Sequence, residues 1–321
     1  MPVTSAPSVE LDAQYRVLRE GAGLLDRSGR GKITVSGDEA AEYLQGQLTN
    51  DVEALVAEQG CYALLLDRKG HIQADMRVLR LGTGEIWLDL EPAATEPTLR
   101  HLRMYSVGRE LAIEDVSERW AIVSLLGPAA ASIAGLEGLG PEHAQRVREA
   151  DGIEVRAVAT DAGLDLIVSA DQAEALRAKL LEAGAEPVSE EAAEIVRIES
   201  GRPRFGRELS PRAMPAEAGV VERAIDFDKG CYIGQEPVAR LHYRGKPNRR
   251  LRGLRLSAAV EPGAALRLGD REVGTVGSAG VSPACGPIAL AIVRREAEPG
   301  ATLAVEGGAS AELVELPFRN S

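Results

Sequence analysis

One order of elements occurs twice in the first 190 residues, and it constrains the fold more than any other feature. A strand, a helix, a two-stranded hairpin with its turn near Arg68-Lys69-Gly70 and a second helix are expected over residues 32–105, and the same order follows over 120–185. The strands alternate apolar and polar side chains, whereas the helices repeat with a period near 3.6. This β-α-β-β-α order is typical of split βαβ, ferredoxin-like units. We therefore predict an α+β fold with two such subdomains.

The last quarter of the chain has a different pattern. A helix over about 189–200 and an irregular segment over 202–219 lead to residue 247, after which short alternating runs are separated by Gly-Asp, Pro-Gly and Gly-Gly turns. Such runs predict a small antiparallel barrel or sandwich. We expect three domains, with the bounds 1–118, 119–246 and 247–321.

Composition excludes several classes of protein. The net charge of 37 − 49 = −12 speaks against a general nucleic-acid or membrane-surface binder. Three distant cysteines without a CxxC pair argue against disulfides and structural zinc, and the four histidines show no metal-ligand spacing. No signal pattern precedes the fold and no run of apolar residues is long enough to span a bilayer. We expect a cytoplasmic protein without a metal site.

Two carboxylates are candidates for chemistry. Glu199 ends the predicted helix, where it opposes the helix dipole, so it either pairs with a nearby arginine or accepts parallel N–H bonds from a guanidine-like heterocycle. Asp75 lies in a predicted strand, on the face opposite to Ile72, Ala74 and Met76. That face is either exposed to solvent or lines a cleft, where Asp75 would serve as an acid, a base or a positioning charge.

The stretch FDKGCYIGQEPVAR, residues 227–240, concentrates reactive groups in a glycine-containing turn. Lys229 favours the thiolate of Cys231, which is either an activated thiol or a small buried filler. The following stretch, residues 240–255, carries seven lysines and arginines and no acid. It is either a solvated basic surface or a docking site for an anion.

These segments together resemble a known family. KGCYIGQEPVAR (229–240) is similar to the signature of the YgfZ-type folate-binding proteins, relatives of the glycine cleavage T-protein, an aminomethyltransferase. YLQGQLTNDV (43–52), YALLLDRKGHIQADMRV (62–78) and RIESGRPRFG (197–206) match further family segments in the right order. The resemblance implies a GcvT-like fold, two folate-binding subdomains with a signature loop at 227–240, a C-terminal barrel, and tetrahydrofolate, or a one-carbon derivative, held between domains.

The resemblance also implies roles for single residues. Glu199 would bind the pterin, and Asp75 would lie near the reactive folate nitrogens. Lys229 and Cys231 occupy the signature positions tied to function, so Cys231, Lys229 and Asp75 are the expected catalytic residues. Glu199, Asp75, Lys229, Gln235, Glu236 and Arg240 are the expected folate-binding residues.

The YgfZ branch implies a particular function. We expect a folate-binding accessory protein for iron–sulfur cluster assembly or repair, whose partners are iron–sulfur client proteins such as tRNA-modifying methylthiotransferases. The alternative is a folate-dependent aminomethyltransferase that uses an aminomethyl-lipoyl carrier protein. No stable nucleic-acid or membrane partner is expected.

Overall fold

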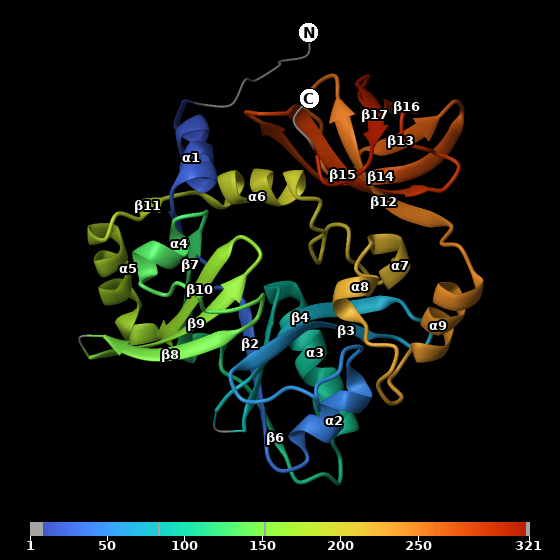
Figure 1. Ribbon diagram of the computed structural model, residues 1–321. Helices are drawn as coiled ribbons and strands as arrows, with labels where there is room; N and C mark the ends of the chain where they lie inside the picture. Colours follow the sequence, from blue (N-terminus) through green and yellow to red (C-terminus); the bar gives the residue numbers. More distant parts are fainter. Residues whose placement is uncertain (1–8, 83, 151, 319–321) are drawn as a thin grey trace. The chain divides into compact units, whose positions relative to one another are not determined.

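A computed structural model describes residues 9–82, 84–150 and 152–318. The chain forms two compact units (Figure 1). The first, called here the two-sheet unit, comprises Val17–Val188 and Val221–Pro237. The second, the barrel unit, comprises the described residues before 17, Ser189–Val220 and the described residues from 238 onward. The predicted domain bounds stay a prediction, and their ends at 1–8 and 319–321 lie outside the described residues.

A five-stranded antiparallel sheet forms the first half of the two-sheet unit. Its strand order is β3-β4-β5-β2-β6. The elements are β2 (Gly31–Ser36), α2 (Ala40–Gln47), β3 (Gln59–Leu66), β4 (Ile72–Arg80), β5 (Ile86–Leu90), α3 (Pro92–Tyr105) and β6 (Ala112–Asp115). The β3–β4 hairpin turns where the sequence predicts it: Gly70 adopts a φ of 81°, a value that favours glycine, and its N–H donates to Asp67 O at 3.0 Å.

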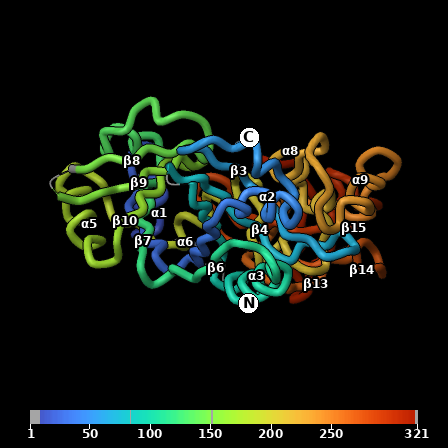
Figure 2. Tube along the Cα trace, turned by 90° about the horizontal axis from the view of Figure 1, so that it is seen from below, coloured from blue at the N-terminus to red at the C-terminus, as the bar shows by residue number. Residues whose placement is uncertain are grey.

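A six-stranded sheet forms the second half, with the order β11-β1-β7-β10-β9-β8. The β1–β11 pair is parallel and the other pairs are antiparallel. Figures 1 and 2 both show β8 and β9 side by side, as their pairing requires. The elements are β1 (Gly23–Asp26), β7 (Trp120–Leu126), α4 (Ala130–Ala134), β8 (Gln145–Ala150), β9 (Ile153–Thr160), β10 (Gly163–Ser169), α5 (Ala173–Glu182) and β11 (Glu186–Pro187).

The two sheets share a small apolar core. Leu79 and Trp87 of the five-stranded sheet pack in one cluster with Ile122 and Ile167 of the six-stranded sheet. The Trp87 ring also meets the edge of Trp120, with 5.0 Å between the ring centroids. Side chains on this face of β4 and β5 are therefore covered by a second sheet.

The barrel unit contains the predicted all-β region. Its six strands close into a barrel in the order β12-β15-β14-β13-β16-β17. They are β12 (Arg249–Leu256), β13 (Ala265–Leu268), β14 (Arg271–Ser282), β15 (Gly286–Arg294), β16 (Thr302–Val305) and β17 (Ser310–Val314). Helix α6 (Glu190–Glu199) packs against β14, and Ser189 caps its N-terminus by accepting from Ala192 N–H at 3.2 Å. The predicted α+β class with a C-terminal antiparallel barrel is confirmed.

The signature segment is not a loop throughout. It is irregular only as far as Gly234, where helix α9 (Gln235–Arg244) begins. Pro237 is tolerated because it lies in the first turn, where its missing N–H has no intrahelical partner to lose. The remaining helices are α1 (Val9–Glu20), α7 (Pro215–Ala218) and α8 (Val221–Ala224). Among the described residues, no helix has both the length and the apolar character needed to cross a membrane.

Candidate functional site

Asp75 lies in β4, where its carboxylate is largely enclosed. The Tyr62 hydroxyl donates to Asp75 Oδ2 at 2.8 Å. Oδ1 is buried and has no hydrogen-bond partner in the part of the chain that the structure describes. Burial raises the pKa of Asp75, while the Tyr62 hydrogen bond and the charge of Arg30 act in the opposite direction. An unsatisfied buried acceptor is costly, so Oδ1 is a candidate acceptor for a donor group of a ligand.

The face of β4 that carries Asp75 is not a solvent-exposed one. Its neighbour Arg77 forms ion pairs with Asp89 on β5 and, at 2.6 Å, with Asp165 on β10. Arg30 also contacts Asp89, with 2.6 Å between Nε and Oδ1. The solvent-exposed interpretation of Asp75 is wrong because the second sheet covers this face, a tertiary effect that strand alternation does not reveal.

Lys229 holds the signature segment to the end of α2. Its buried Nζ donates to Gln45 O and Leu48 O, both at 2.6 Å. These carbonyls lie in the last turn of α2, where carbonyls lack intrahelical donors and a cation is favourable. The ammonium also lies 5.2 Å from the centre of the Tyr232 ring. Burial lowers the pKa of Lys229 to about 8.

The loop after α2 joins the other family-like segments. Thr49 Oγ1 donates to Ala224 O at 2.6 Å and accepts from Leu64 N–H at 2.9 Å. Asn50 Nδ2 donates to Tyr62 O at 2.8 Å and to Arg223 O at 3.1 Å. The segments around residues 43–52, 62–78 and 221–229 thus meet beside Asp75.

Cys231 is exposed, so its interpretation as a buried filler is wrong. The ammonium of the neighbouring Lys229 donates to two backbone carbonyls, and activation of the thiol by Lys229 stays a prediction. Cys61 is half-buried, and burial raises its pKa to about 12.

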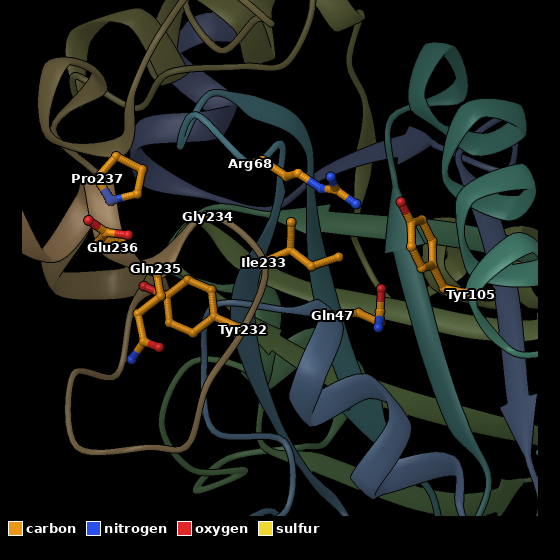
Figure 3. Close-up of a pocket in the computed structure, with 9 residues that line it drawn as sticks. All are labelled: Gln47, Arg68, Tyr105, Tyr232, Ile233, Gly234, Gln235, Glu236 and Pro237. Carbon is orange, nitrogen blue, oxygen red and sulfur yellow. The ribbon is translucent and has the colours of Figure 1, made fainter.

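The signature segment forms one wall of a cavity of about 560 Å³ (Figure 3). Of the predicted site residues, Gln235 and Glu236 line it. Gly234 has a φ of 84°, and a Cβ there would meet Asp67 O at 2.5 Å, so only glycine allows this close approach to the β3–β4 turn. The full lining is Gln47, Arg68, Tyr105, Tyr232, Ile233, Gly234, Gln235, Glu236 and Pro237.

Glu199 belongs to the barrel unit, where it is the last residue of α6 and only 4% exposed. The Tyr15 hydroxyl donates to both carboxylate oxygens at 3.1 Å, and the Ser282 hydroxyl donates to Oε1. Arg197, one of the ion-pair partners considered from sequence, pairs with Glu194. The buried carboxylate is thus held in place by hydroxyl donors.

The basic stretch is divided between α9 and β12. Arg240 lies in α9, and its predicted role toward a folate tail stays a prediction. Arg249 is used structurally, because its guanidinium binds both carboxylate oxygens of Glu217 at 3.0 and 2.7 Å.

Sequence reasoning missed Tyr62, although a signal was present. The β3–β4 register pairs Tyr62 with Arg77 and Leu64 with Asp75. Tyr62 is therefore a diagonal neighbour of Asp75 on the same face of the hairpin. The predicted turn position, extended along the register, would have identified this contact.

Comparison with known proteins identifies aminomethyltransferases as relatives. The chain is 31% identical to the aminomethyltransferase of Thermus thermophilus and 32% identical to that of Saccharopolyspora erythraea. Both alignments cover 95% of this chain and 89% of the relative. The crystal structure of the glycine cleavage system aminomethyltransferase T from Bartonella henselae has the same fold. It matches with a TM-score of 0.85 and 24% identity, over 97% of this chain and 90% of that one.

These relatives correct the function expected from the signature. The prediction of an accessory role in iron–sulfur assembly, with iron–sulfur clients and tRNA-modifying enzymes as partners, is wrong. Relatives at about 30% identity over nearly the whole chain carry the name aminomethyltransferase, which was the alternative.

Two family models account for most of the chain. The GCVT N-terminal domain matches residues 7–229, and the glycine cleavage T-protein C-terminal barrel domain matches residues 249–319. The second match coincides with the closed barrel of β12–β17. The chain therefore belongs to the GcvT family, which comprises the glycine cleavage T-protein and its relatives.

Proposed function

We propose that this protein is a folate-dependent aminomethyltransferase. The substrate is an aminomethyl group bound to a sulfur of the reduced lipoyl arm of a carrier protein. Its carbon is transferred to tetrahydrofolate, where two new C–N bonds form, while the C–N bond to the amino group and the C–S bond break, so that ammonia and the free lipoyl thiol are released. The observation that carries this proposal is the alignment with proteins of that name over 95% of the chain. The largely enclosed, partly unsatisfied carboxylate of Asp75 supports it.

Asp75 is the residue assigned to the chemical step. Its Oδ1 lacks a hydrogen-bond donor in the described chain, so an N–H or ammonium group of a substrate would satisfy it. Because burial raises its pKa, the carboxylate is a better proton acceptor than an exposed aspartate. Asp75 thus stabilises a developing positive charge or accepts a proton during the transfer.

Glu199 is the residue assigned to the pterin. A carboxylate accepts two parallel N–H bonds from the guanidine-like edge of a pterin, and Glu199 is already desolvated and oriented by two hydroxyl groups. Burial before the ligand arrives lowers the cost of ordering the side chain on binding.

The signature residues have subordinate roles in this proposal. Lys229 shapes the site by holding the signature segment to α2. Gln235, Glu236 and Arg240 remain proposed folate contacts, and Cys231 a proposed reactive thiol. The sequence of 229–240 supports a finer assignment of this chain to the YgfZ branch of the family. Membership of that branch does not by itself define the activity.

The test combines binding and turnover. Calorimetric titration with tetrahydrofolate is expected to show binding by wild type and weaker binding by Glu199→Gln, by at least about tenfold for a lost charge-assisted bond. Ammonia release is measured with tetrahydrofolate and the aminomethylated lipoyl carrier. Asp75→Asn is expected to bind folate normally but to lose at least about 100-fold in rate.

Glu182→Gln, an exposed position at the end of α5, is the matched control and should behave as wild type. Absence of folate-dependent ammonia release by the wild-type protein would refute the proposed function. Equal folate binding by Glu199→Gln and wild type would remove only the pterin assignment.

A further inference from the structure

Tyr62 is itself held in place by groups from several elements. The Arg223 guanidinium lies over its ring, 4.9 Å from the centroid. Arg223 in turn forms an ion pair with Glu142, and Asn50 donates to the Tyr62 carbonyl. The ring therefore has little freedom to swing away from Asp75.

An aspartate without such a partner would be poorly oriented. The terminal torsion of a carboxylate has broad minima, so rotation exchanges its two oxygens at little cost. The hydroxyl of Tyr62, 2.8 Å from Oδ2, makes the two oxygens of Asp75 inequivalent. One oxygen is satisfied by the protein, and Oδ1 is left for a ligand.

We propose that Tyr62 is a positioning residue for Asp75, which fixes the carboxylate so that Oδ1 is the oxygen that acts on the substrate. The inference rests on the proposed function, since it assigns the reacting carboxylate to Asp75. Tyr62 acts through Asp75 by restricting its rotation and by stabilising its charged form.

The charges around Asp75 determine what loss of the hydroxyl does. Arg30 and the Tyr62 hydrogen bond favour the carboxylate, whereas desolvation and Glu91 favour the protonated acid. Removing the hydroxyl deletes one of the influences that favour the carboxylate, so the pKa of Asp75 rises further. If the carboxylate is the active form, the acid limb of the pH–rate profile moves to higher pH in Tyr62→Phe.

The decisive variant is Tyr62→Phe, which keeps the ring under Arg223 and deletes only the hydroxyl. We expect kcat for ammonia release to fall at least about tenfold, with the KM for tetrahydrofolate unchanged. The acid limb of the pH–rate profile should move to higher pH. Tyr243→Phe is the control, since that side chain is 67% exposed, and its profile should match wild type.

A second measurement does not depend on turnover. The titration of the Asp75 carboxyl is followed by ¹³C NMR in the substrate-free protein, with Asp75→Asn to assign the signal. An upward shift in Tyr62→Phe supports the proposal. An unchanged Asp75 titration, or parallel losses in kcat, folate affinity and thermal stability, would overturn it. A wild-type protein without ammonia release refutes the proposed function, whereas the NMR titration still decides whether Tyr62 controls the Asp75 carboxylate.

Discussion

Replacing Lys229 with methionine tests whether this lysine is a buried cation that holds the signature segment to α2. Methionine has a similar length but no donor, so Lys229→Met removes the two bonds to Gln45 O and Leu48 O. It also removes a cation from a site where the side chain is only 8% exposed. The variant therefore loses hydrogen bonds and, at the same time, is relieved of a desolvation penalty.

The expected change in unfolding free energy with pH follows from the pKa of Lys229. Burial lowers it from 10.5 to about 8. Below pH 8 both folded and unfolded chains carry the charged lysine, and the penalty is fully present. Between pH 8 and 10.5 the unfolded chain holds a proton that the folded chain has released, so stability rises with pH. A pKa shift of this size corresponds to a gain of about 3 kcal/mol in unfolding free energy between pH 8 and 10.5.

The assay is urea denaturation of wild type and Lys229→Met at intervals from pH 7 to 10.5. Because other lysines and tyrosines titrate equally in both proteins, the difference between the two unfolding free energies isolates Lys229. We expect wild type to gain about 3 kcal/mol relative to the variant across this range. Lys69→Met, in the exposed β3–β4 turn, should give a difference that does not change with pH. If the difference in unfolding free energy between wild type and Lys229→Met were also independent of pH, the lysine would not be a buried cation.

Three further predictions concern individual residues. Gly234→Ala should destabilise the two-sheet unit by about 1–3 kcal/mol in thermal denaturation, because the new Cβ meets Asp67 O at 2.5 Å. At pH 8 a thiol reagent should modify exposed Cys231 rapidly and half-buried Cys61, whose pKa burial raises to about 12, much more slowly, and Cys231→Ala should lack the rapid phase. Burial lowers the pKa of His143 to about 4. As pH falls from 6.5 to 4, the unfolded chain therefore binds a proton at this residue before the folded chain does, and about 3 kcal/mol of unfolding free energy is lost. Denaturation of His143→Gln should show a correspondingly flatter acid dependence.

The regular elements were predictable because their signals are local. The turn at Gly70, the helix over about 189–200 and the alternating runs after residue 247 each specify structure within a few residues. Helix α9 was missed because its first turn contains Pro237 and follows a glycine turn, a combination that also occurs in loops.

The surroundings of the two carboxylates depend on contacts that are distant in sequence. Asp75 is enclosed because Arg77 reaches Asp165, 88 positions further along the chain. Glu199 is oriented by Tyr15 and Ser282, which flank it by 184 and 83 positions. A single sequence identifies such residues as unusual for their local structure, but the partners that explain them come only with the fold.

The signature segment also explains why its sequence misled the functional prediction. Lys229 is accounted for by the carbonyls that it binds, and Gly234 by its close approach to Asp67 O. Both requirements are those of packing this turn against α2 and the β3–β4 hairpin, so they do not depend on the reaction that the protein catalyses. A motif fixed by packing identifies a fold, whereas the reaction depends on the groups that meet the substrate. For this chain we propose Asp75 and Glu199, whose carboxylates lie outside the signature, as groups of that kind.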